Sequence, residues 1–196
     1  MEILYFDKNL IVCIKEVGLD SEKQMPEVLK TEFGGEIYTV HRLDLNVGGV
    51  MVYARNKHTA AEISKTISDG RMIKEYVAMV HGTPEKEGVL EDLLFKDSRK
   101  NKVFVVKRQR AGVKKASLEY VRLTEGEQSL VRIKLHTGRS HQIRVQFASR
   151  GYPLVGDHKY GSKSEQTSPK LYSCKLSFPY KGEDVSFESL PLWAQT

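Results

Sequence analysis

The segment His41–Val50, HRLDLNVGGV, places one carboxylate, Asp44, after two basic residues and before two glycines. The apolar run that follows predicts a buried strand at Gly49–Ala54. Gly48 and Gly49 would let the backbone turn tightly behind the carboxylate. On an extended segment Arg42 and Asp44 would share a face, where an exposed ion pair contributes little. The residues alone therefore leave open whether Asp44 is a surface charge or a functional group.

The elements around this segment predict the fold class. Strand patterns occur at Ile3–Phe6, Leu10–Lys15, Gly49–Ala54, Ile73–His81, Ser117–Leu123, Leu130–Leu135, Leu171–Phe178 and Asp184–Phe187. Helical patterns occur at Glu22–Phe33, Lys57–Asp69 and Ser140–Arg150, the last with Ser140 as its expected N-cap. Because strands outnumber helices and often follow one another directly, we predict an α+β fold. We expect a single domain, residues 1–196, with a mixed, largely antiparallel β-sheet flanked by helices and loops.

Composition excludes several classes of protein. No apolar run approaches the roughly 18 residues that a membrane span needs. The N-terminus lacks the basic start and cleavage site of a signal peptide. The two cysteines, Cys13 and Cys174, cannot build a disulfide framework or a zinc site alone. These features predict a soluble protein of the reducing cytoplasm.

The net charge of +6 is unevenly distributed. The stretch Arg99–Lys115, RKNKVFVVKRQRAGVKK, contains eight basic residues and no acidic one. Such a run can bind a polyanion, because each neutralised phosphate releases a counterion. We expect Lys107, Arg108 and Arg110 to contact nucleic acid, and the alternative is a solvated basic loop.

Other candidate residues can be explained by a structural role as well as by a functional one. His136 and His141 are five apart, which suits neither a helical nor a strand metal site. A metal-dependent phosphodiesterase built from His41, His136, His141 and Asp157 stays an alternative. Tyr76 could be a core aromatic. Arg139, His141, Gln142 and Arg144 could form a basic helix start. Composition and spacing thus reach only a basic α+β domain that binds RNA or DNA.

Three segments in order resemble the RluA-type family of pseudouridine synthases. They are HRLDLNVGGVMVYARN, KEYVAMVHG and GRSHQIRVQFASRGYPLVGDHKYG, which begin at His41, Lys74 and Gly138. The similarity extends from about Ile3 to Phe178. Agreement in three ordered motifs is far less probable by chance than agreement in one.

The resemblance implies an enzyme that isomerises uridine to pseudouridine in ribosomal or transfer RNA, without cofactor or metal. It implies that Asp44 is the catalytic carboxylate, acting either as a nucleophile on ribose or as a base. Tyr76 would stack on the uracil, and Arg144 would keep the carboxylate ionised. Arg42 would fill the space left by the flipped base. Further RNA contacts are expected from His41, Arg139, His141 and Gln142.

The sequence departs from the family pattern in two places. Val47-Gly48 replaces the usual Thr-Ser, and Lys15-Glu16-Val17-Gly18 replaces Lys-Pro-Ala-Gly. The chain also starts directly at the catalytic region, without the S4 domain of many relatives, so target choice is expected to rest on this domain or on a partner. An RNA-binding module that has lost activity is the second alternative. We expect a monomer that binds RNA and no membrane.

Overall fold

A computed structural model describes residues 1–195, which form two compact units. Residues 1–74 and the C-terminal segment from Tyr172 make the first unit, and Glu75–Leu171 makes the second. The elements of the first are β1 (Ile3–Phe6), β2 (Leu10–Lys15), α1 (Gln24–Phe33), β3 (Tyr38–Thr39), β4 (Gly48–Ala54), α2 (Lys57–Ser68), β10 (Leu171–Tyr180), β11 (Glu183–Glu188) and η2 (Leu192–Ala194). Those of the second are β5 (Ile73–His81), β6 (Glu87–Asp97), β7 (Lys102–Val106), β8 (Val113–Arg122), β9 (Gln128–Leu135), α3 (Gln142–Ala148) and η1 (His158–Tyr160). Within this described range, no helix combines the length and apolarity required to cross a membrane.

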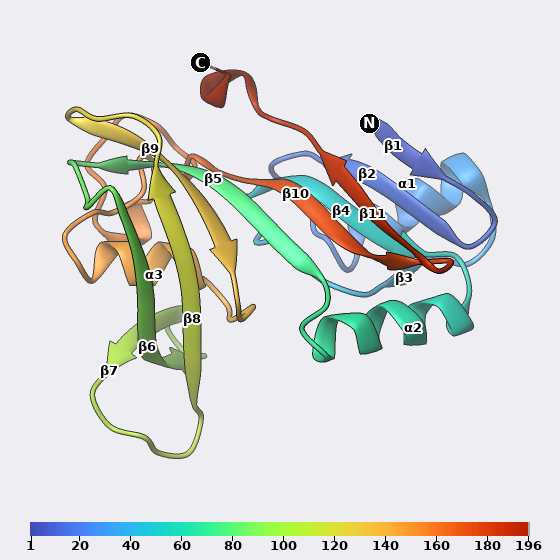
Figure 1. Cartoon of the computed structure of the whole chain (residues 1–196), viewed down its shortest axis with the longest axis horizontal. Helices are drawn as coiled ribbons and strands as arrows, with labels where there is room; N and C mark the ends of the chain where they lie inside the picture. The colour runs from blue at the N-terminus through green and yellow to red at the C-terminus, as the bar shows by residue number, and fades with distance from the viewer. Residues whose placement is uncertain (196) are drawn as a thin grey trace. The chain divides into compact units, whose positions relative to one another are not determined.

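The sheet of the first unit is organised around β4. The strands follow the order β1-β2-β4-β10 (Figure 1). Strand β4 pairs antiparallel with β2 and parallel with β10. In addition, β3 pairs with β4, and β11 pairs with β10. Every residue of β4 is buried. A core of Leu10, Val12, Val50, Val52, Ile63, Met72, Leu176 and Phe178 joins these strands to α2. The mixed, largely antiparallel sheet and the α+β class are therefore confirmed.

Gly49 allows β4 and β10 to approach. Its φ is +124°, and a Cβ atom built on it would lie 2.3 Å from the carbonyl oxygen of Ser173. Only glycine can occupy such a position without displacing the neighbouring backbone. The second glycine of the HRLDLNVGGV segment thus permits the close pairing of β4 with β10 just after the Asp44 turn.

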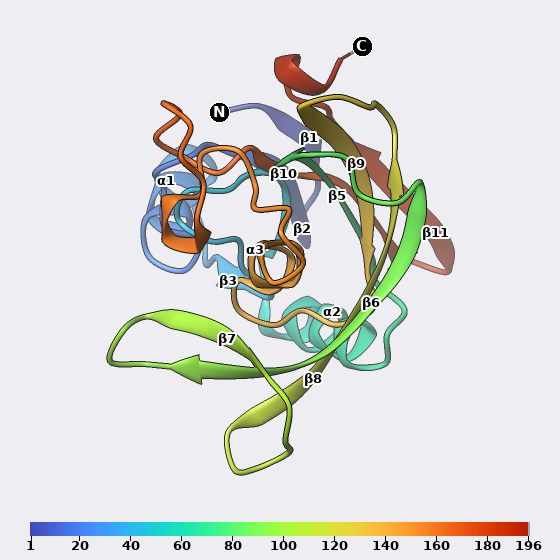
Figure 2. The same cartoon turned by 90° about the vertical axis from the view of Figure 1, so that its left-hand side faces the viewer.

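The second unit contains a curved antiparallel sheet. Its strands follow the order β9-β8-β6-β7, and β5 pairs with β9. In Figure 2 the long strands β6 and β8 run side by side, and α3 is seen nearly end-on. A small core of Leu94, Val103, Ala116 and Val145 packs α3 against β6 and β7.

Two strands of this unit, β6 and β7, were not predicted from the sequence. In Glu87–Asp97 the spacing of Leu90, Leu93 and Leu94 resembles a helix, yet the segment forms β6 between β7 and β8. The basic stretch Arg99–Lys115 begins in the turn of the β6–β7 hairpin, includes its second arm β7 (Lys102–Val106) and continues through the connection 107–112 into the start of β8. We call this arm and its connection the basic hairpin. A basic loop is therefore present only at 107–112, which includes Lys107, Arg108 and Arg110, while 102–106 and the residues from Val113 are strand. Pairing between strands outweighs local pattern here.

Candidate active site

Asp44 lies in the connection between β3 and β4. The amide of Val47 donates to the Asp44 carbonyl oxygen at 2.9 Å, which closes a tight turn. Asp44 is half-buried, whereas Leu45 and Asn46 are exposed. The Leu45 carbonyl accepts a hydrogen bond from the Gly18 amide at 2.9 Å. The loop that follows β2 therefore supports the turn that carries the carboxylate.

Lys15, at the end of β2, places a buried ammonium beneath this turn. Its Nζ donates to the carbonyl oxygens of Glu16 at 3.0 Å, Leu19 at 2.8 Å and Leu45 at 3.3 Å. Burial lowers the pKa of Lys15 to about 8, although Asp20 and Asp44 favour its charged form. Sequence reasoning missed this residue, and the available signal was a lysine that ends the apolar run LIVCIK.

Ser21 holds the turn from the other side of Asp44. Its hydroxyl donates to the Leu43 carbonyl at 3.0 Å and accepts from the Leu43 amide at 3.1 Å. The Tyr53 hydroxyl donates to the Ser21 carbonyl at 3.0 Å, which ties Ser21 to β4. Both neighbours of Asp44 are thus anchored. A carboxylate on such a backbone is oriented before any substrate arrives.

His41 has a structural role in the same segment. Its Nε2 accepts the Val52 amide at 3.1 Å, and only 8% of the residue is exposed. Burial, with a smaller effect of Lys74, lowers the pKa of His41 to about 3. A neutral ring engaged with β4 positions the loop. Arg42, by contrast, is exposed and pairs with Glu22 at 2.9 Å.

Arg144 and Tyr76 belong to the second unit. Tyr76 lies on β5 with 7% exposure. Arg144, on α3, donates from Nε to Oδ2 of Asp157 at 2.6 Å and from Nη2 to Oδ1 at 2.8 Å. Asp157 is buried. This bidentate pair fixes the plane of the guanidinium group.

The Arg144–Asp157 pair weakens the phosphodiesterase alternative. Both carboxylate oxygens of Asp157 accept from Arg144. His41 already accepts a backbone hydrogen bond through Nε2. Within residues 1–195 no cluster of three His, Cys, Asp or Glu side chains has the arrangement of a metal site. Asp157 and His41, two of the donors named for that alternative, therefore have other roles in the fold.

Gln142 shapes the loop that leads into α3. Its Oε1 accepts from Thr137 Oγ1 at 2.8 Å and from the Arg139 amide at 3.0 Å, and its Nε2 donates to the Ser117 carbonyl at 3.0 Å. Only 3% of Gln142 is exposed. These contacts assign it a positioning role for Arg139.

The expected N-cap at Ser140 is wrong. Helix α3 begins at Gln142, and its N-cap is His141 in the left-handed conformation, with φ of 51° and no side-chain cap. The side chain of Gln142 bonds the amide of Arg139 from inside the helix instead. A left-handed non-glycine residue costs free energy and often marks a functional position.

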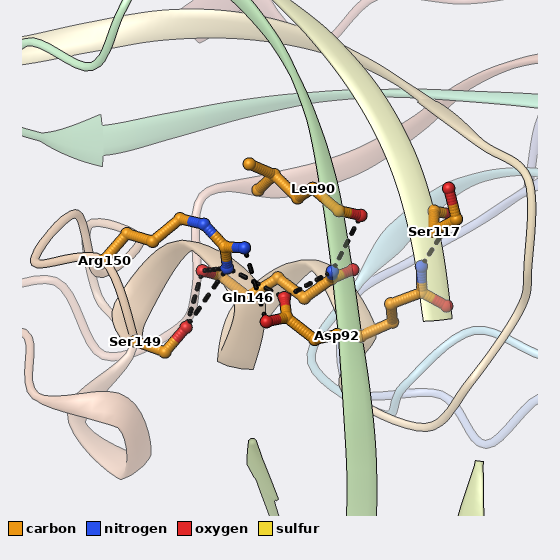
Figure 3. A network of polar contacts seen from close by, with 7 residues as sticks. Leu90, Asp92, Ser117, Gln146, Ser149 and Arg150 are labelled. Carbon is orange, nitrogen blue, oxygen red and sulfur yellow. Dashed lines mark hydrogen bonds and ion pairs between the residues drawn. The ribbon is translucent and has the colours of Figure 1, made fainter. Parts of the chain in front are cut away.

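Helix α3 is anchored to β6 by a buried polar network (Figure 3). Gln146 donates from Nε2 to the Leu90 carbonyl at 3.0 Å and to Oδ2 of Asp92 at 2.7 Å. Arg150 donates to the same carboxylate oxygen at 2.8 Å. Gln146 lies two residues after Arg144. The network therefore fixes the helix that carries the arginine.

The basic hairpin presents its charges to solvent. Lys107, Arg108 and Arg110 are exposed between β7 and β8, and the Arg110 guanidinium lies 4.8 Å from the Phe95 ring centroid. Arg139 donates from Nε to the Lys115 carbonyl at 2.9 Å. The structure thus brings Arg139 beside the hairpin, which the sequence separation did not predict.

Comparison with known proteins adds independent information. The family model described as RNA pseudouridylate synthase matches residues 9–149. An uncharacterized RNA pseudouridine synthase of Aquifex aeolicus is 34% identical over 165 residues, which cover 76% of this chain and 51% of that protein. Ribosomal large subunit pseudouridine synthase D of Borreliella burgdorferi is 34% identical, over 89% of this chain and 60% of that protein.

Solved structures share the fold. Human RNA Pseudouridylate Synthase Domain Containing 1 superposes with a TM-score of 0.86 at 24% identity, over 97% of this chain and 83% of that one. This likeness shows the fold alone. The chain spans about half the length of the Aquifex relative and 60% of the Borreliella relative.

Proposed function

This chain belongs to the RluA-type RNA pseudouridylate synthase family, a family of isomerases that act on RNA, and we propose that it converts uridine to pseudouridine itself. The observation that carries the proposal is the family match over residues 9–149, a range that includes Asp44, Tyr76 and Arg144. The anchored turn around Asp44 supports it, because catalysis requires a carboxylate held in one orientation.

In this proposal Asp44 is the catalytic carboxylate. The reacting atoms of a stacked uridine are hidden, so the nucleotide must be flipped out of the helix. The ring of Tyr76 replaces part of the lost stacking. Arg144 favours the ionised form of Asp44, and an arginine stays charged at any working pH. Asp44 then acts as a nucleophile on ribose or as a base.

The basic residues bind the RNA backbone in the same proposal. Lys107, Arg108, Arg110 and Arg139 contact phosphates, and Arg42 enters the space left by the flipped base. His41, His141 and Gln142 support these contacts by positioning the two loops, since each is engaged within the protein. The enzyme acts as a monomer.

Ribosomal RNA is the substrate we favour over transfer RNA. The relative from Borreliella burgdorferi is named for the large ribosomal subunit. We place the protein in the cytoplasm, and its two cysteines, which are both free thiols, suit a reducing compartment.

Pseudouridine mapping tests the proposal. Unmodified ribosomal and transfer RNA transcripts would be incubated with the purified protein, and every pseudouridine located by chemical labelling and sequencing. We expect new pseudouridine at a few sites in ribosomal RNA. A map unchanged by a protein that binds the RNA would favour the inactive binding module instead.

A further inference from the structure

Tyr160 connects the basic hairpin with helix α3 inside the second unit. Its hydroxyl oxygen accepts the Val103 amide of β7 at 2.9 Å and lies 2.8 Å from Nδ1 of His141, the N-cap of α3. A phenol has one hydrogen and two lone pairs, so it serves both partners at once. One hydroxyl therefore bridges two elements that carry proposed RNA-binding residues.

The ring of Tyr160 makes a second set of contacts. The Arg144 guanidinium carbon lies 5.1 Å from the ring centroid, and the Lys102 ammonium lies 5.3 Å from it. These distances suit cation–π attraction. Asp157, the bidentate partner of Arg144, stands at the N-cap of the short helix that ends at Tyr160. Arg144 thus contacts both the Asp157 carboxylate and the Tyr160 ring, which belong to the same turn.

The same turn contacts the start of the hairpin. Lys159 donates from Nζ to the Asn101 carbonyl at 2.9 Å. Tyr160 also packs against the small core that includes Leu94 and Val103. The segment Asp157–Tyr160 therefore contacts β7, the turn before β7 and α3, and a displacement of the hairpin would be transmitted to Arg144.

We propose that Tyr160 is a positioning residue that keeps Arg144 and His141 in register with the basic hairpin. Phosphate binding on the hairpin then steadies the arginine assigned to the reaction. The inference rests on the proposed function for its catalytic consequence. The mechanical link rests only on the contacts of Tyr160.

Turnover supplies the first test. Tyr160→Phe removes the hydroxyl and keeps the ring, so folding should be preserved. At saturating RNA we expect kcat to fall about tenfold, as small misplacements of catalytic groups do, while the Kd for RNA changes less than about twofold. Tyr160→Leu, which also removes the ring face, should lower kcat further. The matched control is Tyr152→Phe, which removes the hydroxyl of another half-buried tyrosine of the second unit and should behave as the parent protein.

Amide hydrogen exchange supplies a test that does not depend on catalytic turnover. A uridine-containing RNA stem-loop should slow exchange in both β7 and α3 of the parent protein, but only in β7 of Tyr160→Phe. If the parent protein shows this coupled protection but forms no pseudouridine, the proposed function would be refuted, while the mechanical link through Tyr160 would stand. Equal protection of α3 in both proteins, or an unchanged kcat in folded Tyr160→Phe, would overturn the inference.

Discussion

Asp44 is positioned through its two neighbours in the chain. Leu43 is bonded through both backbone groups to the Ser21 hydroxyl, and the Leu45 carbonyl accepts from Gly18 and Lys15. The departures from the family pattern are compatible with this anchoring of the turn. Val47 is buried, and a Cβ atom at Gly48 would lie 3.0 Å from the Lys15 carbonyl. Packing against the β2 loop, in place of the hydroxyls of Thr-Ser, therefore supports the turn.

The neutral state of His41 predicts an acid-sensitive stability. Burial lowers the pKa of His41 to about 3, below the ordinary 6.5. Between these pH values the unfolded chain binds a proton at this site and the folded chain does not. The free energy of unfolding should therefore fall as the pH falls through this window, by at most about 1.4 kcal/mol per pH unit from this site. Urea unfolding at several pH values measures this slope.

His41→Gln tests the origin of that slope. Glutamine offers an acceptor for the Val52 amide but does not titrate. The variant should be less stable near neutral pH, and the difference from the parent protein should narrow as the pH falls. His58→Gln changes an exposed histidine, with 84% of its side chain accessible, and should keep the slope of the parent protein. Parallel stability curves for His41→Gln and the parent would contradict the assignment.

Among the elements, the basic hairpin predicts the salt dependence of RNA binding. Replacing Lys107, Arg108 and Arg110 by Gln removes three exposed cations. Each phosphate contact contributes about 0.7–0.9 to the slope of log K against log salt. We expect weaker binding and a flatter slope, measured by titration of an RNA stem-loop at several salt concentrations.

A matched triple variant separates this contact from net charge. Lys23, Lys30 and Lys65 are also exposed, and they lie at or on helices α1 and α2. Replacing them by Gln removes the same charge and should leave the slope near that of the parent protein. Equal slopes for the two triple variants would show that the hairpin makes no specific contact.

The anchoring of α3 predicts a large effect of one buried amide. In Gln146→Glu a carboxylate would face Asp92 and the Leu90 carbonyl, where the amide now donates two hydrogen bonds. Burying a second negative charge there should lower the free energy of unfolding by about 3 kcal/mol or more. Gln146→Met, similar in size, should cost less because it adds no charge. Thermal unfolding of both variants measures the difference, and equal losses would contradict the role of the network.

Local patterns predicted most elements and missed those that depend on distant partners. Ile3–Phe6, Leu10–Lys15 and Ile73–His81 form strands with the predicted bounds. Segment Glu87–Asp97 lacked a strand pattern, because its pairing with β7 and β8 decides its conformation. The start of α3 was misplaced by one residue, because His141 in the left-handed conformation, and not Ser140, is the N-cap.

For the whole molecule, the motif comparison identified the family, and the structure added the groups that hold the motifs. Asp44 was named from a resemblance, because its spacing alone also fits a surface ion pair. Lys15 and Tyr160 escaped prediction, because the contacts that give them their roles, Lys15 with the Leu45 carbonyl and Tyr160 with the Val103 amide, join segments far apart in the sequence. The apolar run that ends at Lys15 indicates that this lysine is buried, but not that it supports the turn around Asp44.

In the proposed mechanism, Asp44 performs the isomerisation. Asp44→Asn keeps the size of the side chain and removes its negative charge and basic oxygen. RNA would carry uridine tritiated at the ring carbon that becomes the new glycosidic atom, because pseudouridine formation releases that tritium. Circular dichroism and an RNA-binding titration would accompany the assay. We expect steady tritium release by the parent protein, and only background release by an Asp44→Asn protein that folds and binds RNA. Substantial release by the folded Asp44→Asn protein would contradict the claim.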